Sequence, residues 1–162
     1  MKKIIVSVLA VLMCMGLLTA CAGASKTLND TPLFGVMSEL NTQLFNDGDT
    51  MRVIDSKDKL ELYYSVDPAD VKEFAAEVAK NSATEIDEVV LIKAVDEEAA
   101  KRVSGKLELR LQAQKDLCAS YSAELLAVAD KCAVRTEGVL VTLIITEQYD
   151  EAVKICDDLL FN

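Results

Sequence analysis

The segment Ile86–Val95, IDEVVLIKAV, decides the fold of this chain. Its middle is apolar and rich in β-branched residues on both alternating faces, which is typical of a strand that is covered on both sides. Asp96 follows as a helix N-cap. The apolar residues that then recur at helical spacing are Val103, Leu107, Leu111 and Cys118. This period predicts a long amphipathic helix packed against the strand, with a bend or break at residues 120–122.

Two β-prone segments follow the long helix. Residues 132–136 and 139–145 are rich in valine, leucine, isoleucine and threonine, and Glu137-Gly138 lies between them as the expected tight turn. Gly138 suits such a turn because glycine adopts positive φ without steric cost. A last helix, with Thr146 as its expected cap, completes the C-terminal part.

Two proline-containing pairs mark helix starts upstream. Thr31-Pro32 and Asp67-Pro68 each place a capping residue before a proline at the first helical position. The first pair predicts a helix with one apolar stripe. The second predicts a helix through residues 71–78. The stretch between them is ambiguous and could hold a short strand near residues 52–54 and a helical turn near residues 60–64.

These segments together predict an α+β domain. Its sheet is expected to be small, mostly antiparallel and three-stranded, made of one strand plus a hairpin, and packed by the long helix and flanking helices. The 162-residue length fits one compact unit. We therefore expect a single α+β domain over residues 32–162.

The N-terminal residues carry the pattern of a lipoprotein signal peptide. Lys2-Lys3 is a cationic start, the following segment is uncharged, and it ends in Leu18–Cys21, which resembles the lipobox of bacterial lipoproteins. We expect residues 1–20 to be removed, the Cys21 thiol to receive a diacylglyceryl group, and residues 21–31 to form a lipidated tether. The expected location is the extracytoplasmic face of the cell membrane. An ordinary cleaved signal peptide and a retained N-terminal anchor are the alternatives.

Acidic residues outnumber basic ones in this sequence. It has 27 Asp and Glu against 17 Lys and Arg, and a net charge of −10. Because two of the lysines lie in residues 1–20, the remainder carries 15 basic residues and a net charge of −12. Nucleic acids attract basic surfaces, so no nucleic acid is expected as a partner. The expected partners are the lipid bilayer, through acylated Cys21, and an envelope protein or a small ligand.

Few residue patterns in the sequence point to catalysis. It contains no histidine, which excludes a Ser–His or Cys–His nucleophile pair, and no GxxxxGK phosphate loop. We expect no enzyme activity, no cofactor and no metal site, although weak calcium binding by the acidic residues 47–58 stays open. Cys118, Cys132 and Cys156 are expected as buried free thiols, and a disulfide between two of them is the alternative.

One charged pair falls where apolar residues are expected. Glu88 shares a strand face with Ile86, Val90 and Ile92, and Arg110 lies beside Leu107 and Leu111 on the long helix. If that helix packs on that face, the two side chains can form a half-buried ion pair, because a buried charge needs a partner. The pair would either fix the packing register or anchor a ligand.

Several short motifs of the chain resemble those of one family. They are Tyr64–Pro68, Glu85–Val89, Arg110-Leu111 followed by Gln114, Tyr121, and Gly138 before an apolar strand. The resemblance, over about residues 60–160, is to a family of small Gram-positive lipoproteins known as domain of unknown function 4358. It implies a location outside a Gram-positive membrane and indicates Glu88, Arg110, Gln114 and Tyr121 as a polar cluster for binding or structure. The chain departs from the family pattern at Ser65, where glycine is usual, and at residues 123–125, where Pro-Glu-Gln is usual.

Three functions are compatible with these patterns. The first is a membrane-anchored binding module for a ligand or protein, without catalysis. The second is a structural or assembly lipoprotein of the cell envelope. The third is a hydrolase that acts through two carboxylates facing one cleft. A cleft lined by Tyr64, Arg110 and Tyr121 would favour binding, whereas a closed core would favour the structural role.

Overall fold

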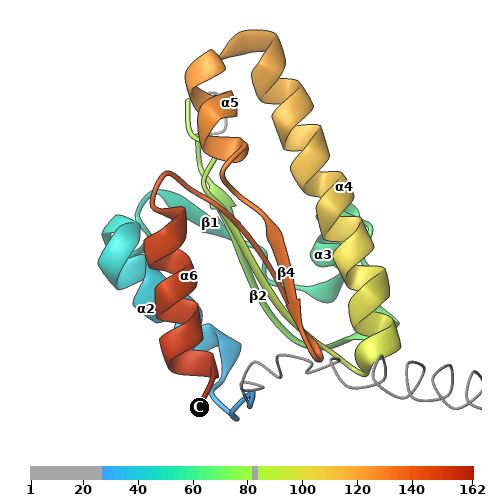
Figure 1. Ribbon diagram of the computed structural model, residues 1–162. Helices are drawn as coiled ribbons and strands as arrows, with labels where there is room; N and C mark the ends of the chain where they lie inside the picture. Colours follow the sequence, from blue (N-terminus) through green and yellow to red (C-terminus); the bar gives the residue numbers. More distant parts are fainter. Residues whose placement is uncertain (1–26, 82–83) are drawn as a thin grey trace, which may run out of the picture.

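Helices cover both faces of one antiparallel sheet in the computed structural model, which describes residues 27–81 and 84–162 (Figure 1). The strands are β1 (Met51–Val53), β2 (Val71–Ala79), β3 (Glu88–Ala94), β4 (Val134–Glu137) and β5 (Leu140–Ile145). The helices are α2 (Leu33–Leu44), α3 (Lys57–Tyr64), α4 (Glu97–Tyr121), α5 (Ala123–Ala129) and α6 (Tyr149–Leu160). Two short 3-10 turns are η1 (Asn46–Gly48) and η2 (Pro68–Asp70). The α+β class is confirmed.

The sheet has five strands in the order β1-β2-β3-β5-β4, and every neighbouring pair is antiparallel. The expected strand and hairpin are present, since β3 pairs with β5 and β5 pairs with β4. Gly138 has a φ of +60° in the hairpin turn, as its position predicted. The expectation of a three-stranded sheet is wrong, because β2 and β1 extend the sheet on the other side of β3.

The strand β2 replaces the helix predicted for residues 71–78. Its apolar residues fit both periods, because Phe74, Ala76 and Val78 line one face of the sheet while Ala75 lines the other. Pairing with two neighbouring strands selects the strand over the helix. β2 lies between β1 and β3, and the Ala76 carbonyl accepts from the Ile54 amide at 2.8 Å. The Asp67-Pro68 pair starts only the short turn η2.

Each face of the sheet carries its own hydrophobic core. Alternate residues of β3 point to opposite faces, so that Val90 and Ile92 pack against α3 and α4 while Val89 and Leu91 pack against α2 and α6. All residues of β3 are buried, as the sequence predicted for a strand covered on both sides. Figure 1 shows α4 on one side of the sheet and the α2–α6 pair on the other.

The helices α4, α2 and α6 start in different ways. Asp96 caps α4 as predicted, with its carboxylate accepting from the Ala99 amide at 2.7 Å. The first amide of α2 instead donates to Glu73 of β2, with 2.6 Å between Leu33 N and Oε1. α6 begins at Tyr149, after Gln148, and not at the expected Thr146 cap. The expected break after α4 is present at Ser122, whose hydroxyl accepts from the Leu125 amide at 3.2 Å.

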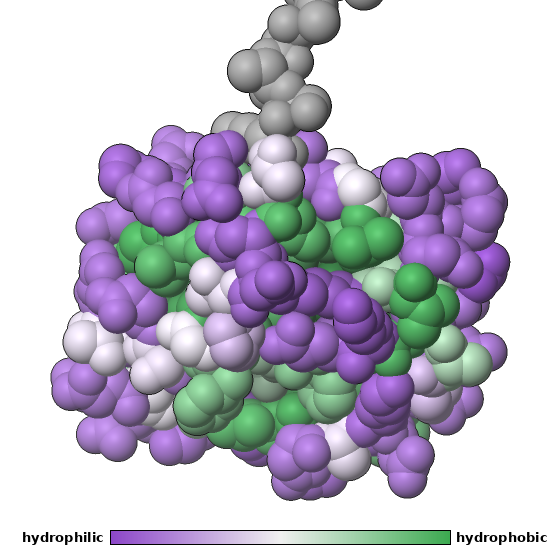
Figure 2. Space-filling view, turned by 90° about the horizontal axis from the view of Figure 1, so that it is seen from below, coloured by the Kyte–Doolittle hydropathy of each residue, from purple (hydrophilic) through white to green (hydrophobic). Residues whose placement is uncertain are grey.

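The two ends of the described chain lie together. Leu28 forms an isolated antiparallel bridge with Phe161, and the Asn29 amide donates to the Leu160 carbonyl at 2.8 Å. Figure 2 shows this end of the molecule, where hydrophobic and hydrophilic surfaces alternate. In residues 27–81 and 84–162, none of the helices combines the length and the apolar character needed to cross a bilayer.

One polar contact in the α2 layer supports a stability prediction. Glu77 is buried, and its carboxylate accepts from Asn41 Nδ2 at 3.1 and 3.2 Å, while Asn41 Oδ1 is buried without a partner among the described residues. Burial raises the pKa of Glu77, although Asn41 and Lys80 oppose this. The folded state therefore binds the proton more readily than the unfolded chain, and the contribution of Glu77 to stability is lost as the pH rises through its folded pKa.

We therefore expect Glu77→Gln to raise the free energy of unfolding at pH 7 by about 1–2 kcal/mol, because the amide carries no charge and can donate to Asn41 Oδ1. The gain should shrink at about pH 4, where Glu77 itself takes up a proton. Urea unfolding at both pH values measures it. A variant that is less stable than the parent at pH 7 would contradict this account of Glu77.

Candidate functional site

The predicted charged residues meet on the α4 face of the sheet. Arg110 of α4 forms a two-point ion pair with Glu88 of β3, with 3.0 Å between Nε and Oε1 and 2.7 Å between Nη2 and Oε2. The Glu88 side chain is only 3% exposed and that of Arg110 is 27% exposed. Gln114, one turn further along α4, places its amide beside both charges, and with the amide oxygen turned toward the guanidinium it accepts from Arg110 Nη1 at 3.2 Å. The three residues form one polar cluster at the end of β3.

Tyr64 extends this cluster toward α3. The Arg110 guanidinium lies over the Tyr64 ring at 5.8 Å from its centre, which is a cation–π distance. The Tyr64 hydroxyl is buried and has no hydrogen-bond partner among the described residues. Burial raises the pKa of Tyr64 far above its usual range, and the neighbouring Glu88 carboxylate raises it further. Burial is the largest single effect on the pKa of Arg110 and lowers it, but the hydrogen bonds to Glu88, the attraction to its charge and the nearby Tyr64 and Tyr63 together raise the pKa of the guanidinium.

Three connected hollows run along α4 next to this cluster. Hollow A, of about 770 Å³, lies between α4 and the segment from α3 to η2. Hollow B, of about 260 Å³, lies between α3 and the middle of α4. Hollow C, of about 280 Å³, contains the polar cluster. A and B share Ser65, Lys106 and Leu109, while B and C share Tyr63 and Arg110, so the three form one α3–α4 groove.

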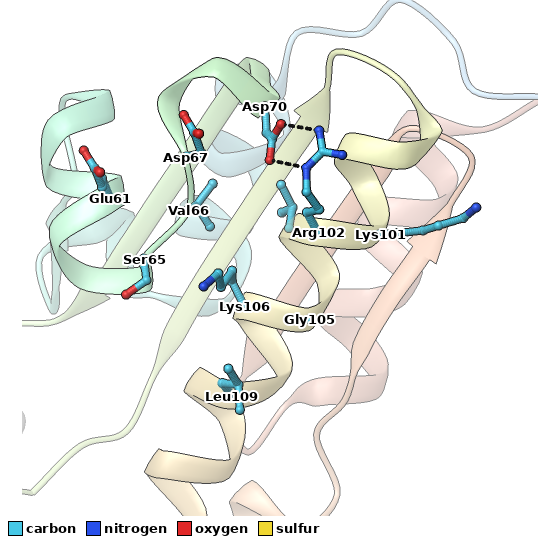
Figure 3. A pocket seen from close by; sticks show the side chains of 11 residues that line it. Glu61, Ser65, Val66, Asp67, Asp70, Lys101, Arg102, Gly105, Lys106 and Leu109 are labelled. Atoms are coloured by element: carbon cyan, nitrogen blue, oxygen red, sulfur yellow. Dashed lines mark hydrogen bonds and ion pairs between the residues drawn. The ribbon is translucent and has the colours of Figure 1, made fainter.

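Figure 3 shows how the walls of hollow A are built. Glu61 and Asp67 come from the α3 side, and Lys106 extends from α4 toward them. The ion pair between Asp70 and Arg102, with 2.6 Å between Oδ1 and Nη2, closes one end. Gly105 lies on α4 between these groups and leaves the helix backbone open to the hollow.

Comparison with known protein families gives one match. The sequence profile of the family described as Domain of unknown function (DUF4358) matches residues 46–146, which is more than half of the chain. The chain belongs to this family. No match is found among curated proteins or among solved structures.

The DUF4358 match begins and ends earlier than the expected span of residues 60–160. It runs from η1 to the end of β5 and contains all lining residues of the three hollows. The helices α2 and α6, which cover the opposite face of the sheet, lie outside it. The groove is therefore part of the DUF4358 region itself.

Tyr121, which was expected in the polar cluster of this DUF4358 protein, is not part of it. Tyr121 ends α4, is 48% exposed and lines none of the hollows described above. Its distance along the helix explains this, because Arg110 and Tyr121 lie three turns apart and the cluster stops at Gln114. Cys21, the expected lipidation site, lies outside the described residues, as does the leader of residues 1–20.

Sequence reasoning missed most of the groove. Tyr63 and Arg52 line hollow C, with the Arg52 guanidinium 5.8 Å from the centre of the Tyr63 ring. Both residues lie in the stretch between the two proline-containing pairs, whose secondary structure the sequence did not decide. Leu109 could have been found, because it is a leucine off the buried stripe of α4 and is 68% exposed.

The cysteines and the acidic residues 47–58 show no binding arrangement. Cys118, Cys132 and Cys156 are free and buried, and burial raises the pKa of Cys156 to about 12. Within residues 27–81 and 84–162, no group of three cysteine or carboxylate side chains could hold a metal ion. In the acidic segment, Asp55 pairs with Lys59 at 2.8 Å. Cys132 and Cys156 belong to the two cores and Cys118 is buried on α4, and none of the three lines the groove.

Ser65 is one of the positions where the chain departs from the DUF4358 pattern, and its backbone conformation leads to a prediction. It ends α3 in the left-handed region, with φ +56° and ψ +29°, a conformation that disfavours side chains and suits glycine. We expect Ser65→Gly to raise the free energy of unfolding by about 0.5–1 kcal/mol, measured by urea denaturation. An unchanged or lower stability would mean that the serine is not strained at this position.

Proposed function

We propose that this DUF4358 protein is a lipid-anchored binding module on the extracytoplasmic face of the membrane, and that it acts without catalysis. Its partner, a ligand or an envelope protein, binds in the α3–α4 groove. The leader with Cys21 supports the anchor. The absence of histidine from the sequence supports a role other than acid–base chemistry.

One observation carries the binding role. The face of the sheet that bears the buried Glu88–Arg110 pair is not closed by its helices, because an open groove follows α4 from Lys101 to Leu117. Of the three residues whose cleft was expected to favour binding, Tyr64 and Arg110 line hollow B, whereas Tyr121 does not line the groove. The binding role is therefore proposed on the open groove itself. Concave surfaces with apolar walls and a few convergent polar groups are the usual form of binding sites.

The anchor can be tested with Cys21. We expect the mature chain in native cells to begin at Cys21 and to carry acyl chains, as read by the mass of its N-terminal peptide. Cys21→Ala should prevent acylation and move the protein out of the membrane fraction, because each buried methylene contributes about 0.8 kcal/mol to membrane binding. A wild-type chain that keeps residues 1–20 without lipid would overturn the anchor.

The binding role can be tested by photo-crosslinking on intact cells. A photoreactive amino acid at Leu109 probes the groove, and the same amino acid at Phe34 is the matched control, since Phe34 is 78% exposed on α2 at the opposite layer. We expect a discrete adduct from position 109 and none from position 34. The same adducts from both positions, or no adduct from position 109, would refute binding in the groove.

The nature of the adduct separates the two non-catalytic roles. A small mass increase at position 109 indicates a soluble ligand. One dominant protein adduct indicates an envelope partner, and such an adduct from both faces indicates the structural or assembly role instead. Arg110 and Glu88 are not chosen as labelling positions, because replacing them is expected to destabilise the fold.

A further inference from the structure

We propose that the α3–α4 groove binds an extended peptide segment of about seven residues whose alternate side chains are apolar and whose net charge is positive. This inference rests on the proposed function, because it names the class of molecule that the groove receives.

The length of the groove favours a linear molecule. Its lining residues on α4 run from Lys101 to Leu117, which corresponds to about 24 Å of helix at 1.5 Å per residue. A small metabolite would fill one hollow only. An extended peptide rises about 3.3 Å per residue, so about seven residues cover the three hollows.

The apolar side chains of the groove favour a peptide over a glycan. Leu109 and Leu117 are 68% and 52% exposed and lie eight residues apart on α4, which places them about 12 Å apart along the helix. This spacing matches residues i and i+4 of an extended chain, about 13 Å apart, whose side chains point to the same side. Aliphatic side chains of a peptide can bury these leucines, whereas the hydroxyl groups of a glycan would lose hydration against them.

The charges of the groove favour a basic peptide. Four carboxylates line it without an ion pair among the described residues, namely Glu61, Asp67, Glu85 and Asp87. Lys106 and Arg52 are the corresponding cations without an ion pair in the same part of the chain. The Arg102 and Arg110 charges are already matched by Asp70 and Glu88. Lys101, which also lines hollow A, pairs with Glu98 at 2.7 Å. The unpaired carboxylates therefore outnumber the unpaired cations, which complements a peptide with a net positive charge.

Gly105 gives the closest approach to the peptide. Glycine inside a helix costs about 0.5–1 kcal/mol relative to alanine, and no protein atom lies within 4 Å of the position that a Cβ would take there. The fold therefore does not require glycine at this site. Gly35 in α2 is equally open but lines none of the hollows described above, so it serves as a control. At Gly105 the missing side chain leaves room for a backbone that lies directly on α4.

The test uses the purified full chain and fluorescence anisotropy. The probe is a labelled heptapeptide that alternates lysine and leucine, with blocked ends. Two control peptides alternate glutamate with leucine and lysine with serine. We expect the lysine–leucine peptide to bind at least about tenfold more tightly than either control. Equal binding of the lysine–serine peptide would show attraction to the acidic protein alone and would overturn the proposal.

Three variants locate the binding. Gly105→Met should weaken the lysine–leucine peptide at least about tenfold, because its side chain enters hollow A, while Gly35→Met should leave binding within about twofold. If Gly105→Met does not fold, Leu109→Ser removes an exposed apolar contact and should weaken binding by a similar factor. Unchanged binding by the folded groove variants would contradict the proposal.

A further ligand separates failure of the peptide proposal from failure of binding in the groove. A linear oligosaccharide of N-acetylglucosamine is tested with the same variants. If it binds, loses affinity with Gly105→Met, and the peptides do not bind, then the peptide proposal is wrong while binding in the groove stands. If the crosslink from Leu109 also fails on cells, the proposed function falls as well.

Discussion

Arg110→Met is expected to lower the free energy of unfolding by about 3 kcal/mol. The substitution removes all three hydrogen bonds to Glu88 and leaves a carboxylate that is 3% exposed without its countercharge. Methionine keeps most of the volume of the arginine stem, so the loss reports on the charge rather than on packing. Urea denaturation followed by far-UV circular dichroism measures it.

A double variant provides the control for this prediction. Glu88→Met together with Arg110→Met removes both charges, and we expect its stability to return to within about 1 kcal/mol of the parent, because an apolar pair can replace a buried ion pair. A loss below about 1 kcal/mol for Arg110→Met alone would show that water reaches Glu88. The pair would then be better explained as part of a ligand site than as a determinant of packing.

Leu107→Ala and Leu109→Ala are expected to differ strongly although the two leucines are two residues apart. Leu107 is fully buried between α4 and the sheet, so its truncation should cost about 2–5 kcal/mol in lost burial and a cavity. Leu109 points into the groove and is 68% exposed, so its truncation should change stability by less than about 0.5 kcal/mol. Thermal and urea unfolding measure both.

The same comparison tests the orientation of α4. If both variants lose similar stability, then α4 is rotated relative to the sheet and the groove is closed by Leu109. If neither does, α4 does not pack on β3 as described. The expected difference therefore supports both the core assignment of Leu107 and the accessibility of Leu109.

The sequence was sufficient where one pattern dominated. The apolar run of residues 89–92, rich in β-branched side chains, predicted a central strand, and the spacing of Val103, Leu107 and Leu111 predicted the long helix. The contact between Glu88 and Arg110 was predicted on the condition that this helix packs on the strand face that bears Glu88, and the structure meets that condition. The turn at Gly138 was also predicted, since a β-hairpin there requires positive φ.

The sequence failed where local pattern and pairing disagreed. Residues 71–78 carry alanines that fit a helix and a strand equally well, and only the neighbours β1 and β3 select the strand. The groove could not be predicted for the same reason, because its second wall comes from α3 and η2, whose position depends on that strand. The exposed position of Tyr121 likewise depends on where α4 leaves the sheet.

Thiol labelling on intact cells tests the central claim most directly. The native Cys118, Cys132 and Cys156 are at most 4% exposed, so a cysteine introduced at the surface is the main reactive thiol. We place it at Ala113, which is exposed and lines hollow B, or at Phe34 on the opposite layer, and treat cells with a membrane-impermeant maleimide. The chain without an added cysteine gives the background.

We predict that Phe34→Cys is labelled rapidly on cells, and that Ala113→Cys is labelled more slowly on cells than in the purified protein, because a partner occupies the groove. No labelling at either position on intact cells would contradict the extracytoplasmic location. The labelling rate at the groove position can be divided by the rate at Phe34. If this ratio is the same on cells and in the purified protein, occupation of the groove is contradicted.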